Sequence, residues 1–154
     1  MPQSDSLIAG RVDLHGRTLR QVLDAHSAWL SRKPDGARAV LINISLSELR
    51  LDGINLAGAE ISSSLLIETE LRGAILGASS WKNVDLRKAM LSEADLAGAT
   101  LVEVQADLAW FSSANLAEAT INGSTFRRAS LAEARMHDAT LTSCDLTGAN
   151  LRGS

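Results

Sequence analysis

Large apolar residues recur at every fifth position over most of this chain. Between Leu41 and Leu151 there are 23 such positions, and only Ala106 among them is small. A second column lies two residues before each of these positions, and from Ala59 onward it holds mainly alanine, serine and threonine. The other three places of each five are mostly polar or glycine. Large and small residues therefore alternate along the chain at the positions that face the interior.

A period of five fits neither regular element. Because a helix repeats every 3.6 residues and a strand every 2, neither keeps one column inside for 23 steps. The chain must turn a corner every five residues, and four such sides close a coil of about twenty residues. Coils stacked about 4.8 Å apart, as hydrogen-bonded strands are, make a rod roughly 26 Å long. The pattern predicts an all-β solenoid over residues 41–154.

A helix is predicted before the repeats. Apolar residues and one histidine follow a helical spacing there: Leu19, Val22, Leu23, His26, Trp29 and Leu30. Thr18 and Gln21 form a capping box at the start, and residues 33–36, which include proline and glycine, end the helix. An uncovered first coil would show apolar side chains and unpaired strand edges to water. Residues 1–40 are therefore expected to form an N-terminal cap, with its helix over about 18–31.

Three stretches carry alanine, then aspartate or asparagine, then leucine; they are residues 94–96, 114–116 and 149–151. This order resembles the consensus of the pentapeptide-repeat family, and the resemblance covers about 111 of the 154 residues. The resemblance implies a right-handed quadrilateral β-helix with an N-terminal capping α-helix. It says little about function, because the same rod serves unrelated roles.

Charge and composition narrow the classes of partner. The formal net charge is -3, so the chain lacks the global positive field that holds proteins on phosphate backbones or anionic lipid. Nucleic acid and membrane are therefore disfavoured as partners. No apolar run approaches the roughly 20 residues that span a bilayer. A bacterial, cytoplasmic protein is expected.

Candidate chemistry is sparse in this sequence. No nucleophile or acid is matched with a base at a recognisable spacing, and the three histidines have no zinc-ligand spacing. Cys144, the single cysteine, falls in the inner column, where a buried thiol is expected to behave as a small hydrophobe. No catalytic residue, cofactor or metal is predicted, and the chain is expected not to be an enzyme.

Two positions disturb the repeat. Ala106 leaves the axis short of volume, and residues 106–108 look like the consensus shifted by two places, which predicts a local bulge in register. Two alternatives remain for Leu108: it turns inward, or it stays outside beside Trp110. Trp81 is large for an axial position, and its coil is expected to widen locally.

Residues twenty apart stack on one face of a four-sided rod, which allows a surface map from the sequence alone. One side and its neighbour gather aliphatic, aromatic and cationic residues, a composition enriched in interface cores. The predicted partner-binding surface comprises Leu65, Ile67, Arg87, Lys88, Met90, Leu108, Trp110, Arg127 and Arg128. The alternative is that these are unrelated surface residues.

The last coil offers a second candidate interface. Its axial residues Leu141, Leu146 and Leu151 lie beside strand edges, a combination that soluble proteins normally cover. An end-to-end homodimer, another docked protein or a longer parent chain would each cover it. Family members that resist quinolone drugs dimerise through their C-terminal end, so the resemblance implies pairing there, but this sequence has no counterpart of the helix through which they dimerise.

The sequence favours a non-catalytic protein-interaction or scaffolding module. The resemblance implies one alternative, a DNA mimic that binds bacterial gyrase or topoisomerase and protects it from quinolones. Residues 41–154 carry fourteen acidic and nine basic side chains, which is a thin imitation of duplex phosphate. A rod of roughly 26 Å is also shorter than one turn of duplex, about 34 Å. The mimic is therefore the less favoured hypothesis.

Overall fold

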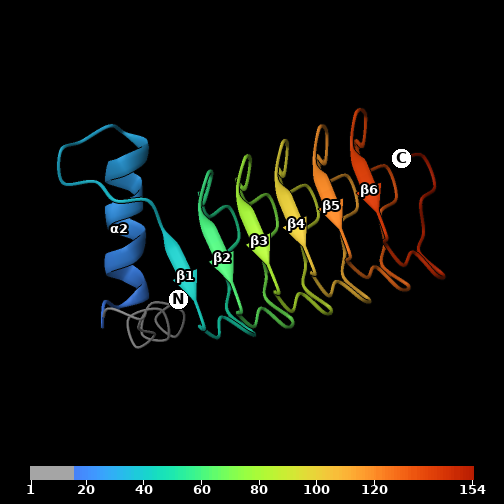
Figure 1. Ribbon diagram of the computed structural model, residues 1–154, viewed down its shortest axis with the longest axis horizontal. Coiled ribbons are helices and arrows are strands. Elements are labelled where there is room, and N and C mark those ends of the chain that lie inside the picture. The colour runs from blue at the N-terminus through green and yellow to red at the C-terminus, as the bar shows by residue number, and fades with distance from the viewer. Residues whose placement is uncertain (1–15) are drawn as a thin grey trace.

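The structure is a computed structural model that describes residues 16–154. One helix precedes six short strands, and the strands form a single parallel sheet in sequence order (Figure 1). The elements are α2 (Leu19–Leu30), β1 (Val40–Ile42), β2 (Glu60–Ser62), β3 (Ser80–Lys82), β4 (Thr100–Val102), β5 (Thr120–Asn122) and β6 (Thr140–Thr142). The part of the expected cap before residue 16 lies outside the described residues.

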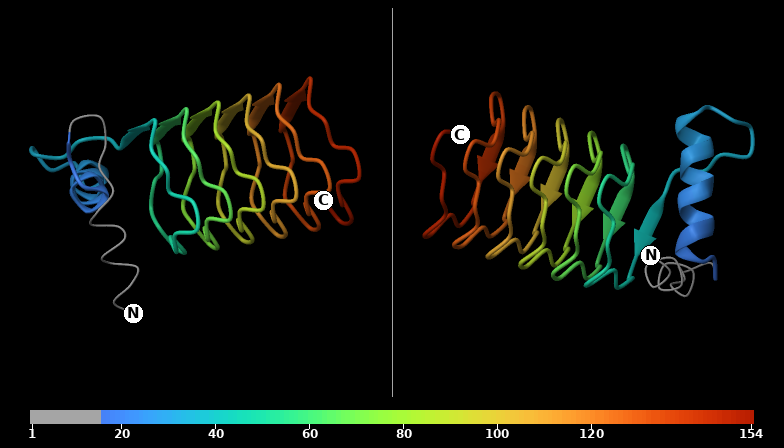
Figure 2. Two further views of the ribbon diagram at one scale, coloured as in Figure 1. Left: turned by 90° about the horizontal axis from the view of Figure 1, so that it is seen from below. Right: turned by 180° about the vertical axis from the view of Figure 1, so that it is seen from behind.

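Each coil takes twenty residues and has four sides. On the strand side, Leu41 pairs with Ile61 and Ile61 with Trp81, always twenty residues on. Single parallel bridges with the same offset join the other three sides, such as Ser45 to Leu65, and the coils stack as a rod (Figure 2). The all-β solenoid and its N-terminal helix, both predicted from the sequence, are confirmed.

The corners have one backbone conformation throughout. The residue two places after each axial residue has a positive φ, from Asn43 at 55° to Gly153 at 75°. At three of the four corners a turn hydrogen bond closes the bend, as where the Leu49 amide donates to the Leu46 carbonyl (3.2 Å). Because an L side chain is strained at positive φ, glycine is favoured at this place.

Serine hydroxyls satisfy amides at the fourth corner, which follows the strands. The Ile44 amide donates to Ser64 Oγ in the next coil (3.2 Å), and the Val104 amide donates to Ser124 Oγ (3.0 Å). Both serines are buried. Small polar residues of the inner column therefore do more than leave room, since they also complete the hydrogen bonding of the coil below.

The axial column forms the core. Every axial residue from Leu41 to Leu131 is buried, and Phe111 and Phe126 contact each other with ring centroids 5.6 Å apart. Trp81 is fully buried and its indole N–H donates to Ser79 Oγ (2.7 Å). Its pairing with the strands on either side is unbroken. An indole is accommodated on the axis because a neighbouring inner-column serine satisfies its polar atom.

The predicted bulge at Ala106 is wrong. Ala106 is fully buried, and bridges from Asp85 to Gln105 and from Gln105 to Thr125 keep the twenty-residue register. Leu108 stays outside at a positive-φ corner (φ 61°), so the outward alternative is correct. The missing axial volume does not shift the chain, because the Ala106 amide donates to the Thr125 carbonyl (2.7 Å) and the Gln105 amide donates to the Val84 carbonyl (2.9 Å), which holds the register on both sides.

Cys144 also differs from expectation. Its thiol is only partly buried, because the residue belongs to the last coil, where burial of the inner and axial columns falls. The Sγ atom lies 3.4 Å from the Thr142 carbonyl and 3.6 Å from the Ile121 carbonyl. The expectation of a fully enclosed thiol is therefore corrected.

Helix α2 lies across the open edge of the first coil (Figures 1 and 2). Thr18 and Gln21 form the expected capping box, with reciprocal bonds of 3.2 and 2.9 Å. His26 is buried and its Nδ1 accepts the Ala39 amide hydrogen (3.0 Å), which joins the helix to the start of β1. The Trp29 ring stacks on His26 with centroids 5.3 Å apart. Both residues therefore serve the packing of the cap.

Candidate binding surface

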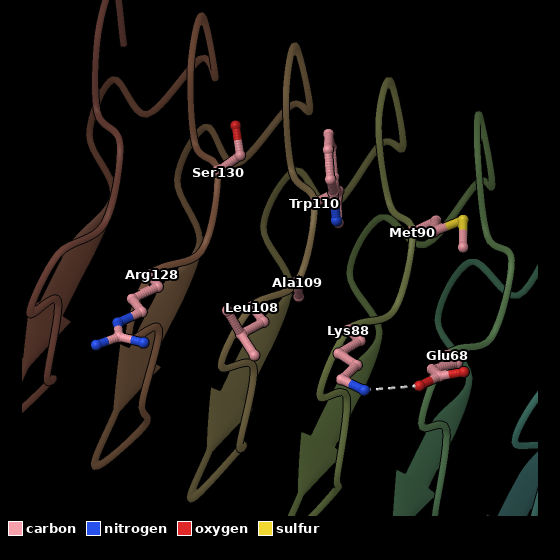
Figure 3. A pocket seen from close by; sticks show the side chains of 8 residues that line it. All are labelled: Glu68, Lys88, Met90, Leu108, Ala109, Trp110, Arg128 and Ser130. Atoms are coloured by element: carbon pink, nitrogen blue, oxygen red, sulfur yellow. Dashed lines mark hydrogen bonds and ion pairs between the residues drawn. The ribbon is translucent and has the colours of Figure 1, made fainter.

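Two columns of outward side chains border a hollow along one corner of the rod. The first column contains Glu68, Lys88, Leu108 and Arg128, all at positive-φ corner positions. The second column contains Met90, Trp110 and Ser130, which are bridged to one another across coils. The hollow between them has a volume of about 570 Å³, with Ala109 between the columns (Figure 3). We call this hollow, with these eight lining residues, the corner groove.

The middle of the corner groove is apolar. Trp110 is 58% exposed and Leu108 is 45% exposed, on adjoining columns of the same coil. Met90 stands one coil before Trp110 and is partly buried. Single exposed apolar side chains are common, but three that share one hollow form a patch of the kind found at binding sites.

Two smaller hollows adjoin the corner groove. One, of about 250 Å³, shares Lys88 and Leu108 with it and adds Ile67, Arg87 and Asp107. The other, of about 340 Å³, shares Met90 and Trp110 and adds Arg72 and Ser92. The binding surface therefore continues around the corner onto both neighbouring sides.

Most cations around the groove are paired with carboxylates of the same or a neighbouring coil. Lys88 Nζ lies 3.0 Å from Glu68 Oε1, and Arg87 Nη2 lies 2.7 Å from Asp85 Oδ2. The hydrogen bond and charge of Asp85 raise the pKa of Arg87. These pairs are largely exposed on the cationic side, so each contributes little to stability. They do neutralise charge locally.

Arg127 is paired in the same way, outside the groove. Its Nε lies 2.6 Å from Asp145 Oδ2, which raises the pKa of the guanidinium. Hydrogen bonds from the Thr147 hydroxyl and then from Arg127 hold the pKa of Asp145 well below its usual range. Arg127 is therefore engaged by the coil beyond it and does not line the groove.

Arg128 differs from these cations. Within residues 16–154 no carboxylate lies within ion-pair distance of its guanidinium. Its stem runs over the next coil, where a Cβ added to Gly148 would stand 3.2 Å from Arg128 Cγ. One uncompensated positive charge therefore stands at one end of an apolar hollow.

The structure brings most of the predicted surface together. Lys88, Met90, Leu108, Trp110 and Arg128 line the corner groove, and Ile67 and Arg87 line the adjoining hollow. Two predicted members lie outside these hollows: Leu65, which is 48% exposed, and Arg127. Whether this surface binds a partner stays a prediction.

The sequence map missed three lining residues, Glu68, Ala109 and Ser130. Two of them were available from the spacing, because Glu68 precedes Lys88 by twenty residues and Ser130 follows Trp110 by twenty. Ile75, 43% exposed on another side, was also missed. Its outward position was also available from the repeat, because Ile75 directly precedes axial Leu76 as Trp110 precedes axial Phe111.

The second candidate interface lies in the last coil. Leu141 and Leu146 are partly buried, and Leu151 is 41% exposed. The end-to-end interface assigned to these residues stays a prediction.

Residues 16–154 contain no group of three or more histidine, cysteine or acidic side chains that could hold a metal ion. No helix within the same residues is long and apolar enough to cross a membrane.

A parallel four-sided coil built on five-residue units defines a pentapeptide-repeat solenoid. The sequence profile described as pentapeptide repeats matches this chain in eight copies, over residues 64–101 and 109–148, which is about half of its length. This chain belongs to the pentapeptide-repeat family, and its fold is the right-handed quadrilateral β-helix of that family. The gap between the two matched blocks contains Ala106, where the repeat departs from consensus.

Comparison with solved structures gives several matches at low identity. Trypsin-treated QnrB1, a plasmid-mediated fluoroquinolone resistance protein, is 19% identical with a TM-score of 0.45, over 76% of this chain and 67% of that one. Rfr23, a pentapeptide-repeat protein from the cyanobacterium Cyanothece 51142, is 19% identical with a TM-score of 0.38, over 73% and 87%. HetL from Nostoc sp. strain PCC 7120, involved in heterocyst differentiation regulation, is 20% identical with a TM-score of 0.29, over 82% and 91%. No curated protein matches the sequence.

Proposed function

We propose that this protein is a non-catalytic interaction module that docks a partner protein on the corner groove. The observation that carries the proposal is the cluster of exposed Trp110 and Leu108 with the partly buried Met90, beside the unpaired Arg128. Tryptophan, methionine and arginine are enriched in interfaces, and tryptophan and arginine dominate the residues whose truncation costs most affinity.

The backbone under the groove is fixed before any partner arrives. The Trp110 amide donates to the Ala89 carbonyl of the coil below (2.9 Å), and the Leu108 amide donates to the Arg127 carbonyl of the coil above (2.9 Å). Because the coils already hold these residues, docking costs little backbone ordering. A small groove on a rigid rod is therefore suited to recognition.

A catalytic use of the groove has little support. Ser130 Oγ lies 2.8 Å from Ser112 Oγ, which is a hydroxyl and not a base. Lys88 and Glu68 form an exposed ion pair, and neither is placed against a nucleophile. A site for covalent or acid-base chemistry requires such a pairing.

Mimicry of duplex DNA is the weaker alternative. It requires rows of unpaired carboxylates, whereas six of the fourteen carboxylates in residues 41–154 pair with cations: Asp52, Glu60, Glu68, Glu70, Asp85 and Asp145. The unpaired charge at the groove is positive, which is opposite to phosphate. The distribution of charge therefore favours docking of a protein.

The proposal is tested by truncating one exposed apolar residue on each of two sides. The partner is purified on the wild-type chain, identified by mass spectrometry and titrated by calorimetry against Trp110→Ala and Ile75→Ala. Trp110→Ala should weaken binding at least about tenfold, which corresponds to about 1.4 kcal/mol. Ile75→Ala, on another side, should change it less than about twofold. Similar losses for both variants would contradict a role for the groove.

A further inference from the structure

The chemistry of the corner groove also indicates what kind of segment occupies it. We propose that the groove takes an extended segment of the partner protein with an apolar side chain followed two residues later by a carboxylate. The apolar side chain packs between Leu108 and Trp110, and the carboxylate pairs with Arg128. This inference rests on the proposed docking function and adds the nature of the partner.

The seat for the apolar side chain is the middle of the groove. Leu108 and Trp110 border it from the two columns, and the fully buried Ala109 lies between them (Figure 3). Ala109 belongs to the inner column and its methyl group faces the core, so no side chain fills the space between the two large side chains. Filling it removes apolar surface of the partner and of both walls from water, which favours binding.

The charge around this seat selects a carboxylate. Lys88 is balanced by Glu68, whereas Arg128 has no carboxylate partner within the described residues. The formal net charge of the whole chain is -3, so this end of the groove differs in sign from the protein's average. A guanidinium with its donors free binds a carboxylate through two parallel hydrogen bonds. An acidic segment therefore complements the groove.

The spacing matches an extended chain lying along the rod. Leu108 and Arg128 occupy equivalent positions one coil apart, which is about 4.8 Å at the backbone. In an extended chain, residues two apart point to the same side and lie about 6.6 Å apart. The long arginine side chain spans the difference. An apolar residue and a carboxylate two places apart therefore reach both partners together.

Backbone pairing does not contribute to this recognition. The amides of Met90, Leu108 and Trp110 are all bonded to neighbouring coils, so the groove offers no strand edge for an added strand. Recognition must come from side chains, which makes it sensitive to single substitutions on either partner.

The test follows the indole N–H resonances of the three tryptophans in the ¹⁵N-labelled full chain, with the Trp110 resonance assigned from Trp110→Phe. The probe is the blocked peptide Ser-Gly-Phe-Ser-Asp-Ser-Gly; the controls replace its aspartate with lysine or its phenylalanine with serine. The acidic peptide should shift the Trp110 resonance saturably and bind at least about threefold tighter than the lysine peptide. The serine peptide should bind more weakly than the acidic peptide.

Reversing the charge of Arg128 is the most decisive part of the test. Arg128→Glu should reverse the preference so that the lysine peptide binds more tightly. Glutamate already occupies equivalent positive-φ corners such as Glu68 and Glu133, so the variant is expected to fold. Indole resonances of Trp29 and Trp81 that match those of the wild type would show that the variant is folded. Arg135→Glu, at an exposed position on another side, is the matched control and should leave the preference unchanged.

Three outcomes would overturn the inference. One is that Trp110 responds equally to the acidic and lysine peptides, and another is that Arg128→Glu leaves the preference unchanged. The third is that a single-stranded oligothymidylate shifts Trp110 at lower concentration than the acidic peptide, which would indicate nucleic acid as the occupant. If no peptide binds while Trp110→Ala still weakens the purified partner, the docking function stands and the occupant assigned here is wrong.

Discussion

The rod and its cap both remove apolar side chains from water, but they do so by different means. In the middle of the rod, an axial residue lies between the axial residues twenty positions before and after it, as Leu96 lies between Leu76 and Leu116. The cap is a single helix held by contacts that occur once, among them His26 with Ala39 and Trp29 with His26. Repetition makes the rod regular, whereas the junction between the cap helix and the first coil depends on a few contacts that occur only once.

The largest effect is expected inside the rod. Leu96→Ala removes a fully buried axial side chain from the middle of the column, where coils on both sides limit collapse of the cavity. We expect a loss of about 2–5 kcal/mol in the free energy of unfolding, measured by urea denaturation.

Asp95→Ala is the control for this variant on the outward side of the same repeat. It removes hydrogen bonds from the Ala97 amide (3.1 Å) and the Asn115 side chain (2.9 Å), for a loss of about 1 kcal/mol. Equal losses for the two variants would refute the assignment of inside and outside positions.

The junction is tested next by Gly36→Ala. A Cβ at Gly36 would stand 2.3 Å from the Trp29 amide nitrogen and 2.6 Å from the Ala28 carbonyl carbon. These are backbone atoms of the helix, so the chain that leaves α2 must move. We expect a loss of about 1–3 kcal/mol in the free energy of unfolding.

Gly77→Ala is the matched control for the junction. Neither glycine has a positive φ, and a Cβ at Gly77 would meet only the Ala97 carbonyl oxygen at 3.4 Å. Its effect in the same urea titration should lie within about 0.5 kcal/mol of the wild type. If Gly36→Ala is equally mild, the close approach does not hold the cap in place.

The difference between the repetitive rod and the single contacts of the cap also explains how much of the structure the sequence predicts. The period of five fixed the coil, the axial column and the outward corners, because every repeat reports the same geometry. The prediction of a bulge at Ala106 was wrong, because residues 106–108 resemble a shifted repeat but the coils on both sides hold the register. The adjoining columns of the groove could be mapped from the twenty-residue spacing. The pairing of Lys88 with Glu68 could be expected from the same spacing, because the two residues are twenty apart. The isolation of Arg128 could not, since arginines also pair diagonally between coils, as Arg127 does with Asp145 eighteen residues on.

A smaller effect is expected where the cap contacts the first coil. A Cβ at Gly58 would lie 3.2 Å from the end of the Trp29 ring, whereas nothing lies within 4 Å of the same position at Gly53. Both glycines have similar φ, 70° and 68°, so alanine is similarly strained at each. Gly58→Ala should therefore cost a few tenths of a kcal/mol more than Gly53→Ala.

The contact with the Trp29 ring is isolated by repeating both substitutions in a Trp29→Ala background. The extra cost at Gly58 should then disappear, as measured by urea denaturation of the four variants. An extra cost that persists without the ring would mean that the coil itself rejects a side chain there.

The smallest expected effect is a pH dependence of the junction. Burial, with the nearby charge of Arg38, lowers the pKa of His26 below its usual value of 6.5, while the Ala57 backbone acts in the opposite direction. Neutral His26 accepts the Ala39 amide hydrogen at Nδ1, and protonation at that atom abolishes the bond. Because the pKa is lower in the folded state, the unfolded chain binds the proton more readily. Stability is therefore full above pH 6.5 and falls as the pH is lowered through 6.5 towards the folded pKa.

This dependence is measured by thermal unfolding between about pH 7.5 and 5, a window in which histidine titrates. The shifted carboxylates do not interfere there, since the lowered pKa values of Glu70 and Asp145 move their contributions below pH 4.5. His26→Gln should remove the slope, because glutamine does not titrate. His137→Gln, at an exposed position far along the rod, should retain it. A slope that survives in His26→Gln would assign the pH dependence to another part of the molecule and leave the cap junction insensitive to protonation.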